Sequence, residues 1–177
     1  MENNLLDSAL KYAEMGFSVI PIFAGDKKPA YIKWEPYQRE RATSGQIKEW
    51  WEKWPSANIG LVTGKISDLC IIDADSKEAV EQIEKLLPEN IICPIACTPR
   101  GGRHYYFRYT DGLINKAGVL EKIDVRTKGG YIVAAPSRNN GSGQYRWEIE
   151  IDSFNLLKMP SNLFSFLIRG GMGGKES

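Results

Sequence analysis

The sequence predicts an α/β (α+β) domain with a mixed central sheet and flanking helices. Helical and strand-like patterns alternate from the N-terminus to about residue 96, and only strand-like patterns follow Thr98. Of the 177 residues, 42% are hydrophobic, which is enough to form a core. A chain of this length most simply forms a single domain with one functional site.

The first half of the chain contains both helices and strands. Apolar residues recur at helical spacing over 5–13, and a buried strand is expected over 17–22. A long loop over 23–42 leads to Thr43-x-x-Gln46, a capping-box pattern that opens a helix with a buried tryptophan stripe. Further elements are expected as strands over 59–62, 69–74 and 91–96 and a helix over 76–87.

The second half is predicted to be rich in β-structure. Gly-, Asn- and Ser-rich turns separate expected strands over 103–109, 122–127, 131–135 and 145–149. The last residues are rich in glycine, which is typical of a flexible linker. The expected division is therefore a catalytic domain over 1–169 and a flexible C-terminal linker or tail over 170–177.

Composition argues against several classes of protein. No run approaches the roughly 20 apolar residues that a membrane span needs, and the N-terminus is acidic and polar, unlike a signal peptide. We therefore expect a cytoplasmic protein without a membrane partner. Three cysteines and a single histidine make a disulfide scaffold and a zinc finger poor interpretations.

Charge is balanced over the chain but uneven along it. The net charge is +1, whereas the segment 100–146 holds nine basic residues against three acidic ones. Such a segment is either a solvated face or an anion-binding strip for phosphates. Composition alone leaves both interpretations open.

Two acidic residues follow the apolar run at residues 69–72. Strand alternation places Asp73 and Asp75 on one face, with Ile72 and Ala74 on the other. Because neighbouring carboxylates repel each other, the pair favours a bound Mg²⁺ or Mn²⁺ ion. In the alternative interpretation Asp75 caps the helix that follows it, which explains Asp75 but not Asp73.

Two further polar positions extend this pattern. Alternation places Asp124 and Arg126 on the same face of a strand, where they present a carboxylate with a guanidinium or form a surface salt bridge. His104 lies on the more polar face of its strand, two residues after Gly102, and the Gly101-Gly102 pair allows a phosphate to approach the backbone closely. The alternative for this histidine is a structural role.

An ordered set of short motifs resembles the primase-polymerase (prim-pol) domain, the bifunctional DNA primase/polymerase N-terminal family of the archaeo-eukaryotic primase superfamily. The resemblance runs from about Ala9 to Trp147, and the order of the motifs is more specific than any one of them. The motifs are Lys27-Lys28-Pro29, Trp50-Trp51, Ala57-Asn58-Ile59-Gly60, Thr63-Gly64, Asp73-Ala74-Asp75, Thr98-Pro-Arg-Gly-Gly-Arg-His104, Asp124-Val125-Arg126 and Ala135-Pro136-Ser137.

The resemblance implies an active-site cleft in the fold and a role for each matching residue. Asp73, Asp75 and Asp124 would be the catalytic metal ligands in a two-metal site for Mg²⁺ or Mn²⁺, and His104 would contact the phosphates of the incoming nucleotide. Further expected nucleotide or template contacts are Lys28, Thr98, Arg100, Arg126, Ser137 and Arg138.

The expected activity is template-directed nucleotidyl transfer from a dNTP or NTP to a primer 3′-hydroxyl, with release of pyrophosphate. The expected partners are a single-stranded DNA template, a primer, and a downstream helical or helicase domain of the kind that relatives carry. The template strand would lie along the basic segment. Two alternatives remain: a Mn²⁺-dependent nucleotide-sugar transferase that uses the Asp-x-Asp pair, and a non-catalytic DNA-binding module.

Overall fold

The computed structural model describes residues 4–24, 31–141 and 143–172. Within these ranges, no helix is both long and apolar enough to cross a membrane. The elements are α1 (Asn4–Glu14), β1 (Ser18–Ile22), the 3₁₀ helix η1 (Glu35–Gln38), α2 (Ser44–Lys53), β2 (Asn58–Val62), β3 (Cys70–Ala74), α3 (Lys77–Leu86), β4 (Ile95–Cys97), β5 (Arg103–Phe107), β6 (Lys116–Leu120), β7 (Ile123–Arg126), β8 (Tyr131–Ala134), β9 (Arg146–Ile149) and α4 (Ser161–Met172).

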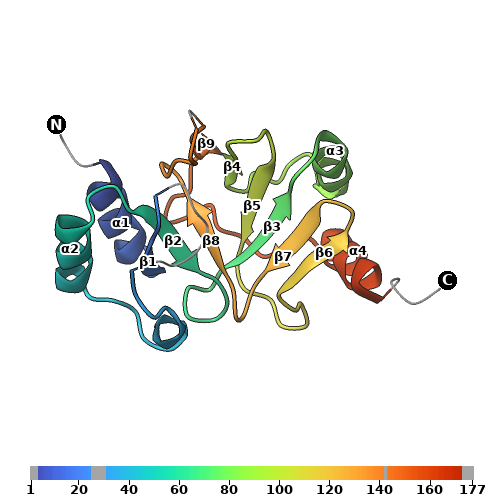
Figure 1. Cartoon of the computed structure of the whole chain (residues 1–177). Coiled ribbons are helices and arrows are strands. Elements are labelled where there is room, and N and C mark those ends of the chain that lie inside the picture. The colour runs from blue at the N-terminus through green and yellow to red at the C-terminus, as the bar shows by residue number, and fades with distance from the viewer. Residues whose placement is uncertain (1–3, 25–30, 142, 173–177) are drawn as a thin grey trace.

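The strands form two sheets that lie next to each other (Figure 1). One has the order β1-β2-β8 and the other the order β6-β7-β3-β5-β4-β9. Every strand pair in the described residues is antiparallel. The α+β class with flanking helices is therefore confirmed, whereas the expected single mixed sheet is divided into two antiparallel sheets.

Two large clusters of apolar side chains lie on the opposite faces of the six-stranded sheet. On one face, Ile72 of β3 and Phe107 of β5 pack with Ile83 of α3 and Leu163 of α4. The other face shares a core with α1, α2 and the three-stranded sheet. Figure 1 shows α1 and α2 beside the three-stranded sheet. β3 lies inside this sheet and therefore presents alternate residues to two different environments.

Local sequence explains where the helices begin. The hydroxyl of Thr43 accepts a hydrogen bond from the backbone N–H of Gln46 at 3.1 Å, as its capping pattern predicts. The N-cap of α3 is Ser76, whose hydroxyl accepts from the N–H of Ala79 at 3.0 Å. The interpretation in which Asp75 caps this helix is therefore wrong, because the next residue does so.

Several elements differ from the sequence prediction. β6, η1 and α4 were not expected, and β4 begins at Ile95 rather than at residue 91 because Pro94 interrupts the apolar run. α4 continues to Met172, so the first three residues of the expected linker over 170–177 are helical, and 173–177 lie outside the described residues.

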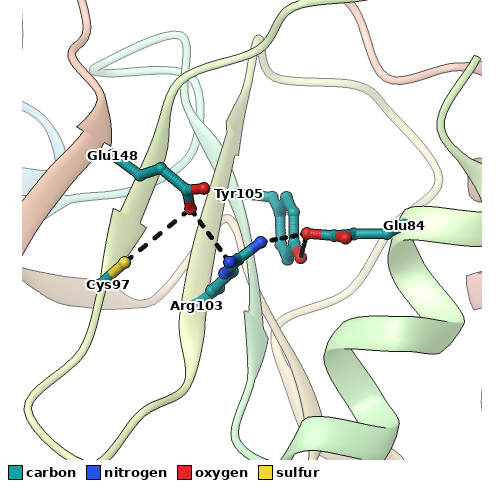
Figure 2. Close-up of polar contacts among 5 residues, drawn as sticks. All are labelled: Glu84, Cys97, Arg103, Tyr105 and Glu148. Atoms are coloured by element: carbon teal, nitrogen blue, oxygen red, sulfur yellow. Dashed lines mark hydrogen bonds and ion pairs between the residues drawn. The ribbon is translucent and has the colours of Figure 1, made fainter. Parts of the chain in front are cut away.

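A polar network fixes α3 to the six-stranded sheet (Figure 2). The guanidinium of Arg103 on β5 forms ion pairs with Glu84 of α3 and, at 3.3 Å, with Glu148 of β9. The hydroxyl of Tyr105 also donates to Glu84 at 3.3 Å, and the thiol of Cys97 lies 3.9 Å from the Glu148 carboxylate. These contacts lie on the sheet face opposite to Asp73; they hold β5 against α3 and connect β9 to β5 and β4.

Candidate active site

Asp73 lies in the middle of the six-stranded sheet, between His104 and Asp124. In the antiparallel registers it is directly opposite His104 on β5 and directly opposite Asp124 on β7. Directly opposed residues project from the same face with Cβ atoms about 4.5–5.5 Å apart. The three side chains that the sequence places far apart are therefore neighbours on one face.

The imidazole of His104 contacts Asp73 through one of its two nitrogens. Its Nε2 lies 3.4 Å from Asp73 Oδ1, and the side chain of His104 is 7% exposed. Its Nδ1 is buried and has no hydrogen-bond partner among the described residues. Because buried polar atoms are nearly always paired, such an atom at the wall of a cavity marks a place where a ligand can bind.

Asp75 lies just beyond the end of β3 and is fixed through its backbone. Its N–H donates to the carbonyl of Lys122 at 2.8 Å, and the loop 98–102 packs beside it. That loop is closed by Thr98, whose Oγ1 accepts from the N–H of Gly102 at 3.0 Å. A Cβ at Gly102 would lie 2.6 Å from the carbonyl oxygen of Ala74, so glycine allows this close approach.

A cavity of about 470 Å³ opens at this end of the sheet and contains both Asp73 and Asp75 in its wall. We call it the acid-lined cavity. Its other lining residues are Asn58, Thr98, Pro99, Arg100, His104, Val133, Arg138, Asn139, Asn140, Gly141 and Tyr145. Two carboxylates and two guanidiniums in one cavity suit a ligand that carries both metal ions and phosphates.

An adjoining cavity of about 230 Å³ lies on the other side of His104 and Tyr145. Asp73, His104, Val133 and Tyr145 line both cavities, and Arg126 lines only the smaller one. The ring of Tyr145 lies 5.9 Å from that of His104. Burial, and after it the charges of Asp73 and Asp75, raises the pKa of Tyr145 to about 12, so its phenol stays protonated.

Asp124 shares the face of Asp73 but forms contacts of its own. Its carboxylate accepts a hydrogen bond from the N–H of Gly118 and lies 3.3 Å from the guanidinium of Arg126. Its side chain is 29% exposed, and it is not part of the wall of either cavity. The salt bridge between Asp124 and Arg126 is therefore present, and it lies next to Asp73, which is directly opposite Asp124.

The carboxylates fit a hard divalent cation. Magnesium is commonly held by one or two carboxylates, together with water and substrate phosphates, and Asp73 and Asp75 supply that pair in one cavity. In residues 4–24, 31–141 and 143–172, no group of three or more His, Cys, Asp or Glu side chains is arranged as a complete metal site. A metal would therefore need ligands beyond the two acids, and Asp124 is the nearest further carboxylate on that face.

The other predicted contact residues fall into three groups. Thr98, Arg100 and Arg138 line the acid-lined cavity. Ser137 does not line it, because its side chain is fully buried and its Oγ accepts from the N–H of Ile59 at 2.9 Å. Lys28 lies outside the described residues.

Several arginines of the basic segment are paired with carboxylates. Arg103 and Arg108 form ion pairs with carboxylates remote from the cavities, and Arg126 forms one with Asp124. Arg100 and Arg138 face the acid-lined cavity. The cations of this segment that line the acid-lined cavity therefore come from two loops, and Arg126 lines the adjoining one.

The structure adds residues to which the sequence had assigned no role at the site. Tyr145 lines both cavities, and Asn58, Asn139 and Asn140 line the acid-lined one. The Asn139-Asn140-Gly141 turn was visible in the sequence only as a loop signal. Its approach to the cavity depends on the pairing of β2 with β8, which local patterns do not reveal.

Comparison with known protein families identifies the class. The family model for the bifunctional DNA primase/polymerase N-terminal domain, Prim-Pol, matches residues 9–156. The chain belongs to this family. Membership indicates nucleotidyl transfer of the DNA primase/polymerase type, with nucleic acid and nucleotides as substrates. A search of curated proteins found none that matches the chain.

Proposed function

We propose that this domain extends a primer on a single-stranded DNA template, using dNTPs or NTPs, with Asp73, Asp75 and Asp124 as the acids of a Mg²⁺ or Mn²⁺ two-metal centre. One observation carries the proposal: Asp73 lies directly opposite both His104 and Asp124, beside a cavity that also contains Asp75. Bound divalent ions would lower the pKa of the attacking hydroxyl and stabilise charge on the leaving group.

The reaction balances without any further reactant. The oxygen of the primer 3′-hydroxyl forms a bond to the α-phosphorus of the nucleotide, the bond between that phosphorus and the bridging oxygen breaks, and pyrophosphate leaves with the electron pair. The hydroxyl proton passes to solvent. The work of the protein is to position the two reactants and stabilise charge, which together supply most of the rate in phosphoryl transfer.

Cationic and neutral donors near the acids suit the triphosphate. Arg100 and Arg138 line the acid-lined cavity, and their guanidiniums would bind phosphate oxygens in a bidentate manner. The unpartnered Nδ1 of His104 is available to donate to a phosphate oxygen when it carries the proton. Arg126 at the adjoining cavity is a further phosphate contact in this proposal.

Primer extension tests the proposal directly. A labelled primer on a longer template, and the template alone, are incubated with dNTPs or NTPs and with Mg²⁺, Mn²⁺ or EDTA, and the products are sized on a gel. We expect metal-dependent extension that Asp73→Asn lowers by at least 100-fold, because losing several kcal/mol of charge stabilisation costs about tenfold per 1.4 kcal/mol.

The matched control is Asp111→Asn, since Asp111 is exposed and accepts a hydrogen bond only from Tyr109 among the described contacts. This variant should extend primers at the wild-type rate. Extension by Asp73→Asn within threefold of wild type would remove Asp73 from the chemistry. Thermal stabilisation by nucleotide sugars instead of dNTPs would favour the sugar-transferase alternative, and EDTA-resistant DNA binding without incorporation would favour the binding module.

A further inference from the structure

Asn58 is a buried polar residue whose side chain is bonded to the backbone of Arg138. It lies at the start of β2 and is 4% exposed. Its Oδ1 accepts a hydrogen bond from the N–H of Arg138 at 3.0 Å, and its Nδ2 donates to the carbonyl of Arg138 at 2.7 Å. The amide thus pairs with both backbone groups of one residue, as a neighbouring strand would.

Arg138 begins a loop that is otherwise held by its own hydrogen bonds. It forms an isolated bridge with Gln144, and the side chain of Gln144 donates to the carbonyl of Pro136 at 3.1 Å. Inside the loop, Asn139 Oδ1 accepts from the N–H groups of Gly141 and Gly143. These hydrogen bonds restrain the described residues on both sides of the turn, and Asn58 connects Arg138 to the three-stranded sheet.

The loop carries its guanidinium to the candidate site. The exposed side chain of Arg138 lines the acid-lined cavity and also a second cavity of about 490 Å³. The position of the Arg138 backbone therefore decides how its guanidinium is shared between the two cavities. The two hydrogen bonds from Asn58 hold that backbone in place.

We infer that Asn58 is a positioning residue that fixes Arg138 for its contact with the phosphates of the incoming nucleotide; the inference rests on the proposed function. Asn58 acts through the backbone of Arg138, because its Oδ1 and the shorter hydrogen bond of its Nδ2 are both used there; Nδ2 also donates to the carbonyl of Phe23 at 3.5 Å. Removing the amide leaves the N–H and carbonyl of Arg138 without their buried partner, so the loop would shift towards water.

The test is a double-mutant cycle with steady-state primer extension and Mn²⁺. Arg138→Ala should raise the KM for the nucleotide about tenfold or more, the usual effect of losing a hydrogen bond to a charged group. Asn58→Ala should raise the same KM about threefold to tenfold and leave kcat within twofold. In the Arg138→Ala background, Asn58→Ala should change KM by less than twofold, because the group that it positions is absent.

Asn155 supplies a matched control. Its amide accepts from the N–H of Asp152 at 2.9 Å and donates to the carbonyl of Glu150 at 2.8 Å, so it also bridges two backbone groups. Asn155 does not line the acid-lined cavity or the adjoining one. Asn155→Ala should leave KM unchanged. Where Asn58→Ala does not fold, Asn58→Asp keeps the shape and the acceptor and removes the donor, and it should show the same dependence on Arg138.

The outcomes separate the two proposals. If the wild-type protein incorporates nucleotides and Asn58→Ala raises KM equally with and without Arg138, the positioning inference is wrong while the proposed function stands. An effect on kcat alone also overturns it. If the wild-type protein incorporates no nucleotide and dNTPs with Mn²⁺ do not raise its thermal stability, the proposed function itself fails.

Discussion

Gly102→Ala is expected to displace the strand end that carries the two aspartates. A Cβ at this position would lie 2.6 Å from the carbonyl oxygen of Ala74 and 3.2 Å from the Cα of Asp75. Ordinary contacts begin near 3.4 Å, and the two atoms named belong to the backbone, so the loop and the end of β3 must separate by several tenths of an ångström.

The size of the effect follows from that separation. Inserting a methyl group into a closely packed contact costs about 1–3 kcal/mol of unfolding free energy, and each kcal/mol lowers Tm by about 2–4 °C in a chain of this size. A shift of about 1 Å in catalytic groups costs about 100-fold in rate. A displacement of several tenths of an ångström in Asp73 and Asp75 should therefore lower the rate of primer extension about tenfold. Thermal unfolding and primer extension measure the two effects on the same preparation.

Gly101→Ala separates displacement from backbone strain. Gly101 has a φ of +86°, and nothing lies within 4 Å of an added Cβ. Alanine there costs about 1–2 kcal/mol through its left-handed backbone without pushing on β3. We expect a comparable loss of Tm with incorporation within threefold of wild type. Equal losses of incorporation in both variants would refute the reasoning.

Four further substitutions test other parts of the structure. Arg103→Ala should lower Tm by about 2–4 °C, because a partly buried ion pair contributes about 1 kcal/mol. Arg108→Ala should lower Tm less in the same melting assay, because the side chain of Arg108 is 51% exposed. Burial raises the pKa of Tyr145 to about 12 against 10 for a free phenol, so the unfolded state loses this proton first. The unfolding free energy of the metal-free protein should therefore fall between pH 10 and 12, and Tyr145→Phe should make that decline shallower in urea titrations; an unchanged slope contradicts the assignment. Asp124→Asn should lower incorporation at least 100-fold with Tm within about 3 °C, because an amide oxygen can still accept from Gly118; unchanged incorporation would exclude Asp124 from the chemistry.

Strand alternation predicted the faces of the candidate site correctly. Ile72 and Ala74 pack in the core on one side, and Asp73 projects to the other with its neighbours on β5 and β7. Alternation cannot supply register, however. Asp73 meets His104 and Asp124 because three strands separated by loops pair at one particular offset, and that offset depends on the packing of both sheet faces.

The missed elements lacked a clear local signal. β6 contains Gly118 at a φ of +64° and pairs irregularly with β7, so its sequence shows no simple alternation. α4 ends in glycines that resemble a linker, yet Leu163 and Leu167 are buried in the core and stabilise it as a helix. Tertiary packing thus overrides the weak helix propensity of its last turn.

The location of the acids follows from where the two sheets stop sharing a core. Ile71 on β3 and Tyr106 on β5 are directly opposite each other and are fully buried beneath the three-stranded sheet. One strand period further on, the same face carries Asp73 opposite His104, and the cavity begins. Since the opposite face remains packed against α3 and α4, β3 is held rigidly on one side while its carboxylates face the cavity on the other. Charged groups therefore gain fixed positions without complete desolvation, which is the condition that charge stabilisation at a metal centre requires.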